Sequence, residues 1–104
     1  MKKIIFILLI FIGASSNSYS QEIKRIIVGN IDAKISIIAF ESMTCSHCAD
    51  FHRNVFPKLK KEYLDTGLAK IEFRHFPLDI AAFNASKVAQ CKNDGNSDIL
   101  ESLY

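Results

Sequence analysis

The sequence KISIIAFESMTCSHCADFH, residues 34–52, decides the fold because an apolar segment in it leads directly to two closely spaced cysteines. Residues 34–40 predict a β-strand, since isoleucine and other residues that favour strands recur along them. Apolar side chains fall on both faces of this strand. One face has Ile35 and Ile37, and the other has Ile38 and Phe40. We therefore expect a strand covered on both sides, as in a parallel or mixed sheet between helices.

The segment after this strand predicts a long helix with an interruption. We expect the helix to begin at about Cys45, with Thr44 as its N-cap, because a threonine side chain accepts hydrogen bonds from the first helical amides. Apolar residues then recur at three- and four-residue steps, which predicts one buried stripe. The stripe consists of Cys48, Phe51, Val55, Leu59 and Tyr63. Pro57 lacks a backbone N–H, so we expect a kink or break near residues 53–56, and Gly67 is expected to end the helix.

A second strand is predicted over residues 69–76, where apolar and charged side chains alternate and Ile71 and Phe73 would face inward. Two strands joined by a crossover helix form a right-handed βαβ unit, which predicts an α/β fold. Residues 22–28 are rich in β-branched side chains and predict a short additional strand.

Two more helices are predicted towards the C-terminus. Asp79 is expected to cap a helix over residues 80–92, and Cys91 is expected to be a small buried residue of that helix. A shorter helix would start at Ser97 or Asp98. Nothing follows to cover its apolar residues, so we expect them to be exposed. These residues are Ile99, Leu100, Leu103 and Tyr104.

The first twenty residues have the layout of a secretory signal peptide. Two lysines precede an apolar run over residues 4–12, and Ser18 and Ser20 place small residues before a cut at Gln21. The run is shorter than the roughly 20 apolar residues that cross a bilayer. We therefore expect no stable membrane insertion once residues 1–20 are removed, with an uncleaved N-terminal anchor as the alternative.

The charge of the chain argues against nucleic-acid binding. Lys2 and Lys3 account for the formal net charge of +2, so residues 21–104 carry no basic surplus. Because phosphate backbones are bound mainly through an excess of lysine and arginine, no nucleic-acid partner is expected.

Cys45 and Cys48 form a Cys-x-x-Cys motif that encloses Ser46 and His47. A helix N-terminus and a neighbouring histidine both stabilise a thiolate, which is the nucleophile in disulfide exchange. Cys45 precedes the first turn, whereas Cys48 lies on the apolar stripe and is expected to be less accessible. We therefore expect Cys45 to attack or be attacked, and Cys48 to resolve the mixed disulfide.

Two other uses of this motif are open. The cysteines could form a structural disulfide, or they could hold a metal ion together with His52. A structural zinc site generally needs four ligands, and the sequence has no second Cys/His pair, so no metal and no cofactor are expected. His52 and His75 are expected to be surface or packing residues.

Residues 40–52 resemble the active-site region of the DsbA-like branch of the thioredoxin superfamily, particularly its bacterial periplasmic members. The resemblance continues through residues 55–59 and 73–79 and into the alanine-rich helix that carries Cys91. It implies a thioredoxin fold with a helical insertion and a periplasmic thiol–disulfide oxidoreductase. Its partners would be reduced or misoxidised exported proteins, and a membrane redox partner is compatible with it. The implied site consists of catalytic Cys45 and Cys48 and supporting Thr44, Ser46 and His47.

The sequence departs from the family pattern at three points. Ser46 stands where many members have proline. Ala39 stands where many members have an acidic residue, and Glu41, two residues later on the same strand face, is a candidate proton relay in its place. No residues that match the second half of the family fold, including its cis-proline loop, are found in the sequence, so the chain is expected to be a fragment or a truncated form. Residues 21–104 are therefore expected to form a partial domain, a βαβ unit plus the start of the helical insertion. The alternative to an oxidoreductase is a non-catalytic remnant in which the two cysteines form a structural disulfide.

Overall fold

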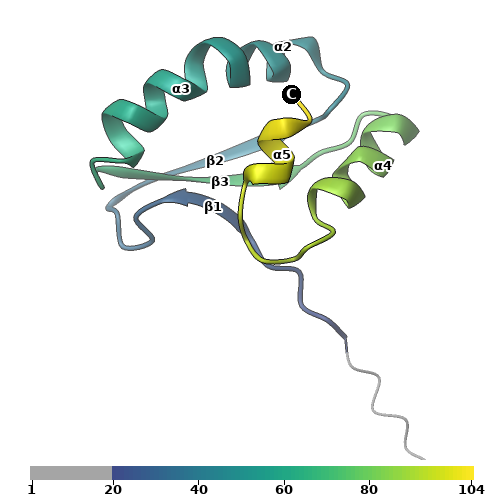
Figure 1. Ribbon diagram of the computed structural model, residues 1–104, viewed down its shortest axis with the longest axis horizontal. Coiled ribbons are helices and arrows are strands. Elements are labelled where there is room, and N and C mark those ends of the chain that lie inside the picture. The colour runs from purple at the N-terminus through teal and green to yellow at the C-terminus, as the bar shows by residue number, and fades with distance from the viewer. Residues whose placement is uncertain (1–19) are drawn as a thin grey trace, which may run out of the picture.

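The fold is described by a computed structural model over residues 20–104, and residues 1–19 of the predicted signal peptide lie outside the described residues. A three-stranded mixed sheet with the strand order β1-β3-β2 forms its centre (Figure 1). The strands are β1 (Ile26–Gly29), β2 (Ile35–Glu41) and β3 (Ala69–His75). β2 runs parallel to β3, with Glu41 opposite His75, and β1 runs antiparallel to β3. The predicted βαβ unit in an α/β fold is thus confirmed.

One long helical crossover joins β2 to β3 and lies along one face of the sheet (Figure 1). It consists of α2 (Ser46–Asp50), the π-helical turn η1 (Phe51–Val55), α3 (Phe56–Leu59) and a second π-helical turn, η2 (Lys60–Leu64). Two shorter helices follow β3, namely α4 (Ile80–Ala89) and α5 (Asp98–Ser102). Within residues 20–104, no helix has the length and apolar character needed to cross a membrane.

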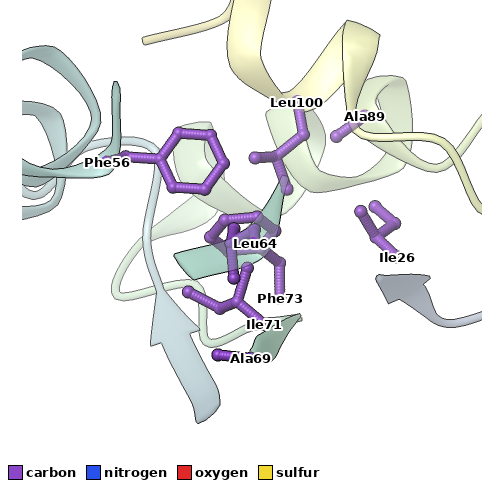
Figure 2. Packing of buried hydrophobic residues seen from close by; sticks show 8 residues of the cluster. All are labelled: Ile26, Phe56, Leu64, Ala69, Ile71, Phe73, Ala89 and Leu100. Carbon is purple, nitrogen blue, oxygen red and sulfur yellow. The ribbon is translucent and has the colours of Figure 1, made fainter. Parts of the chain in front are cut away.

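The hydrophobic core lies between the crossover and the sheet. The central strand β3 supplies Ile71 and Phe73, which are 0% and 4% exposed and face inward as their alternation predicts. Phe56 and Leu64 reach them from the crossover, and Leu100 reaches them from α5 (Figure 2). Burial of these side chains fixes the crossover, and with it the start of α2, against the end of β2.

The predicted interruption of the long helix is a π-helical turn. At the end of η1 the amide of Phe56 bonds to the carbonyl of Phe51, five residues earlier, in place of the α-helical partner. Pro57 follows immediately, at the start of α3, and it can donate no backbone hydrogen bond to the preceding turn. The break near residues 53–56 is therefore confirmed, directly before the residue that lacks a backbone donor.

The π-helical turns change which residues of the crossover are buried. Because these turns hold more residues than an α-turn, positions four apart stay on one face. His52, Phe56 and Leu64 are buried, whereas Val55 and Tyr63 are 52% and 46% exposed. The predicted apolar stripe is thus wrong for Val55 and Tyr63, since it assumed an uninterrupted α-helical period.

β2 is covered on one face only, which corrects the expectation of a strand buried on both sides. Ile37 and Ala39 are partly buried against the core, whereas Ile38 and Phe40 are 47% and 61% exposed. The reason is that the crossover and α5 contribute to the same core cluster, on the side of the sheet to which Ile37 points.

α5 folds back onto the core, so the expected exposure is wrong for three of the four apolar residues, Ile99, Leu100 and Tyr104, of which Ile99 is partly buried. Leu100 is only 1% exposed, and Tyr104 is partly buried because its ring stacks on His52 at 4.1 Å with an interplanar angle of 8°. Leu103 points away from the core and is 40% exposed, as expected.

The turn after α4 places Cys91 outside the helix. Asp79 caps α4 as predicted, because its carboxylate accepts a hydrogen bond of 2.7 Å from the Ala82 amide. The helix ends at Ala89, however, and Cys91 is exposed, so its prediction as a buried helical residue is wrong. The physical reason is Asn93, which has a positive φ of 48° and whose side chain bonds to the backbone before β1.

Candidate active site

The two cysteines lie at the start of the crossover, just after β2 ends. Cys45 has extended backbone and precedes the first helical residue of α2, while Cys48 lies within the first turn. The amide of Cys45 bonds to the Ser42 carbonyl at 3.0 Å, and this turn directs the chain from the strand into the helix. Cys45 therefore occupies the N-cap position, and the prediction of Thr44 at that position is wrong.

The two thiols at the helix start have pKa values that are shifted in opposite directions. The backbone amide of Cys48 lowers the pKa of Cys45, and the Cys48 thiol and the His47 amide act in the same direction. Burial raises the pKa of Cys48, although the backbone amide of Ser42 opposes this effect. Of the two thiols, Cys45 thus holds the negative charge more readily and Cys48 holds the proton.

The residues predicted to support the cysteines occupy different positions around them. Ser46 and His47 are exposed between the two cysteines. The Thr44 hydroxyl lies 3.3 Å from the Ser42 hydroxyl. The pKa of Asp79 is lowered first by the hydrogen bond from the Ala82 amide and second by a hydrogen bond from the Thr44 hydroxyl. Thr44 therefore connects the cysteine loop to the start of α4.

The loop that follows β3 is bonded to the loop that precedes the cysteines. The Phe76 amide donates to the Glu41 carbonyl at 2.7 Å, and the Leu78 amide donates to the Ser42 hydroxyl at 3.2 Å. Since Ser42 is 3% exposed, this connection is largely shielded from water. It holds the backbone on which the cysteine turn begins.

Glu41 and His52 form a buried hydrogen-bonded pair beneath the cysteines. Nε2 of His52 donates to Oε2 of Glu41 at 2.7 Å, and the residues are 8% and 6% exposed. The sequence predicted only a surface or packing role for His52, and its pairing with Glu41 was missed. The spacing of four residues from Cys48 indicates that His52 shares a helix face with Cys48, but it does not indicate Glu41 as the partner.

A shallow apolar hollow of about 230 Å³ opens beside Cys48. Its lining is formed by Ala39, Phe40, Glu41, His47, Cys48 and Phe51. The hollow thus places aromatic and aliphatic surface next to Cys48, between the start of the crossover and β2, an edge strand of the sheet. Within residues 20–104, no three side chains of the types that ligate metals form a cluster.

Comparison with solved structures places this arrangement among known proteins. The crystal structure of Wolbachia pipientis alpha-DsbA1 matches with a TM-score of 0.70 and 38% sequence identity, over 80% of this chain and 43% of that one. Residues 21–103 also match the family model described as Thioredoxin. The chain belongs to the DsbA-like branch of the thioredoxin superfamily. Oxidised BdbD from Bacillus subtilis is another member with a similar fold, with a TM-score of 0.64 and 26% identity over 76% of this chain and 45% of that one.

A curated relative from Rickettsia bellii is provisionally named a protein-disulfide oxidoreductase, and this DsbA-like chain is 40% identical to it over 74 residues. The aligned part is 71% of this chain and 29% of the relative. A protein of the same description from Rickettsia conorii is 36% identical over 83% of this chain and 31% of its own length. The chain thus spans less than a third of the length of these relatives.

Proposed function

We propose that this chain exchanges disulfides with exported proteins through Cys45 and Cys48, as a thiol–disulfide oxidoreductase of the periplasm. The observation that carries the proposal is the placement of the two thiols at the helix start, where the Cys48 amide lowers the pKa of Cys45 and burial raises the pKa of Cys48. Disulfide exchange needs one sulfur that leaves or attacks as a thiolate and a second that closes the ring. The names of the Rickettsia relatives agree with this chemistry.

Oxidation of a substrate would proceed in two exchanges. A substrate thiolate attacks Sγ of Cys45 in the Cys45–Cys48 disulfide, and Cys48 leaves as a thiolate that takes up a proton. A second substrate thiolate then attacks the substrate sulfur of the mixed disulfide and expels the Cys45 thiolate. Two electrons pass from the substrate dithiol to the cysteine pair, and the stabilised Cys45 thiolate is a good leaving group.

Four neighbouring residues support this exchange in the proposal. His47 adds a donor or a positive charge near the Cys45 thiolate, and Ser46 keeps the dipeptide between the cysteines polar and exposed. Thr44 fixes the turn before Cys45 through its bonds with Ser42 and Asp79. Glu41, buried next to Cys48 in the lining of the hollow, serves as the proton relay.

The proposal also includes the route and the partners of the chain. Residues 1–20 act as the signal peptide, and residues 21–104 form the exported DsbA-like domain. Its substrates are reduced or misoxidised exported proteins, whose apolar side chains fit the hollow beside Cys48. A membrane redox partner would restore the disulfide after each turnover.

The test is disulfide exchange in a glutathione buffer, followed by oxidation of a reduced unfolded test protein. The chain should exchange with glutathione, and Cys45→Ala should abolish the reaction. Cys48→Ala should stop it at a mixed disulfide on Cys45. Cys91→Ala is the matched control, because Cys91 is exposed and distant in sequence, and it should behave as the wild type. A Cys45–Cys48 disulfide that glutathione cannot open would favour a purely structural bridge.

A further inference from the structure

His52 is the most buried polar side chain of the crossover, and it has a single polar partner. Its side chain is 4% exposed and that of Glu41 is 6% exposed, and Nε2 and Oε2 lie 2.7 Å apart. Its other ring nitrogen, Nδ1, is buried and has no hydrogen-bond partner in the described part of the chain. Nε2 is therefore the ring nitrogen through which His52 bonds to its polar partner, and its N–H donates to the carboxylate.

Aromatic rings hold the imidazole in this orientation. The Tyr104 ring is stacked on it at 4.1 Å, and the ring centroids of Phe73 and Phe56 lie 5.2 and 5.4 Å away. These rings come from three different elements, β3, α3 and the residues that follow α5. The imidazole cannot turn away from Glu41 without disturbing all three contacts.

The Glu41 carboxylate lies beside the sulfur that must gain and lose a proton. Glu41 and Cys48 line the same hollow, and the amide of Ser42, the residue after Glu41, hydrogen-bonds to the Cys48 sulfur. The charge of Glu41 also acts on Cys45, where it opposes the thiolate, but as the last of the contributions. A carboxylate is expensive to bury unless it is hydrogen-bonded, and His52 Nε2 supplies the side-chain donor that the structure shows for it.

We propose that His52 is a positioning residue for disulfide exchange: its Nε2–H holds the buried Glu41 carboxylate beside Cys48, so that Glu41 exchanges a proton with the Cys48 thiol. This inference rests on the proposed function and assigns a role to a residue outside the Cys-x-x-Cys motif. His52 acts through Glu41 and contacts neither the substrate nor the sulfurs.

The proton step balances within the site. When the cysteine pair reduces a disulfide, the Cys45 thiolate attacks one sulfur of the reagent, the reagent's S–S bond breaks, and the other sulfur leaves as the first thiolate, so that a mixed disulfide remains on Cys45. The Cys48 S–H then gives its proton to the Glu41 carboxylate, and the Cys48 thiolate attacks Sγ of Cys45. The reagent's second thiolate leaves, the Cys45–Cys48 disulfide forms, and two electrons have passed to the reagent. The proton on Glu41 is released to solvent or returns to Cys48 in the reverse reaction.

The pH dependence of this step is set by several titratable groups around Glu41 and His52. His75 lies opposite Glu41 in the sheet, and burial lowers its pKa. Burial also raises the pKa of Tyr104, so its phenol is neutral near neutral pH. The titratable and charged groups that face the pair or its rim are Cys45, Cys48, His75, Tyr104, Arg53, Lys60 and Glu101.

The test separates the two exchanges with an aromatic disulfide reagent that releases a coloured thiol at each step. Attack by Cys45 gives the first release, and resolution by Cys48 gives the second. The full chain is used with Cys91→Ser, so that the exposed third thiol does not contribute. His52→Phe removes the donor and retains an aromatic ring for Tyr104, Phe56 and Phe73, whereas His52→Gln retains an N–H donor without a titratable ring. Asn54→Gln, on an exposed residue of the same helix, is the matched control.

We expect His52→Phe to slow the second release about 100-fold at neutral pH, the lower end of the range for general acid–base catalysis. The first release should change little, His52→Gln should recover most of the second, and Asn54→Gln should match the wild type. Glu41→Gln should reproduce the His52→Phe defect and flatten the pH profile of the second release. Glu41→Gln keeps the shape of the Glu41 side chain, so it tests the proposed proton transfer even if His52→Phe does not fold.

Three results would overturn the inference. The first is a second release at the wild-type rate in both His52→Phe and Glu41→Gln. The second is a failure of His52→Gln to recover the rate, because a donor alone would then be insufficient. The third is an equal slowing of both releases, which would place the effect on Cys45. If the wild type shows no second release at all, the proposed disulfide exchange itself is wrong, and the role of His52 falls with it.

Discussion

Replacing Leu100 by alanine should destabilise the domain by about 3 kcal/mol, although the side chain lies in the last helix. Leu100 is 1% exposed and packs in the core cluster that contains Phe56 and Phe73. The substitution removes three buried carbon atoms, which is about 2.4 kcal/mol at 0.8 kcal/mol for each methylene. The cavity that remains adds to this loss, so the total is about 3 kcal/mol, or about a hundredfold in the unfolding equilibrium.

The measurement is urea unfolding of the full chain followed by circular dichroism, with Leu103→Ala as the matched control. Leu103 lies just past the end of α5 and is 40% exposed, so its replacement should cost at most about 1 kcal/mol. Leu100→Ala should also loosen the stacking of Tyr104 on His52, because α5 positions that ring. Equal losses for the two variants, or a larger loss for Leu103→Ala, would refute the packing of α5 onto the core.

Alkylation of the reduced chain at mildly acidic pH should modify Cys45 before Cys48, because the helix amides lower the pKa of Cys45 and burial raises the pKa of Cys48. Peptide mapping that finds the reverse order would contradict this prediction. His47→Ala should make the disulfide less oxidising by about 1 kcal/mol in a glutathione titration, where about 30 mV corresponds to 1.4 kcal/mol. An unchanged redox equilibrium would count against a role for the His47 side chain. The pKa of Asp79 is lowered in the folded chain, so its contribution to stability is present above the unfolded pKa of about 4 and is lost as the pH falls through the lower folded value. Unfolding curves of the wild type and Asp79→Ala should therefore differ at neutral pH and converge in acid, and a constant difference would refute the cap. Gly29→Ala should lower the free energy of unfolding by about 2 kcal/mol or more in the same assay, since Gly29 has a φ of 101° and an added Cβ would lie 2.6 Å from a backbone oxygen. An unchanged free energy of unfolding would refute this tight turn.

Local sequence patterns were sufficient to predict the central unit of the fold. The alternation over residues 69–76 placed Ile71 and Phe73 in the core, because a strand has a fixed period of two. The cap at Asp79 and the interruption before Pro57 depend on hydrogen bonds of single residues, and both were predicted in place. These features need no knowledge of distant parts of the chain.

Features that depend on distant contacts were not predictable in the same way. The pairing of Glu41 with His52 requires the end of a strand and the second turn of a helix to meet, at a phase that the π-helical turn sets. The burial of Leu100 requires α5 to return to the crossover, and nothing within that short helix specifies this. A uniform α-helical period consequently gave the wrong buried face at Val55.

The π-helical turn η1 also determines how the length of this segment can change. It is one residue longer than an ordinary turn and lies between Cys48 and Phe56, so a single deletion there would convert it to an α-helical turn. The Phe56 amide would still bond to the Phe51 carbonyl, now four residues earlier, so Phe56 would keep its place in the core relative to Cys48. The same deletion within α2, which has no extra residue, would rotate the rest of the crossover by about 100° relative to Cys45, the angle of one residue in a helix of 3.6 residues per turn. The crossover is therefore expected to tolerate the loss of one exposed residue of η1, such as Asn54, but not the loss of one residue of α2.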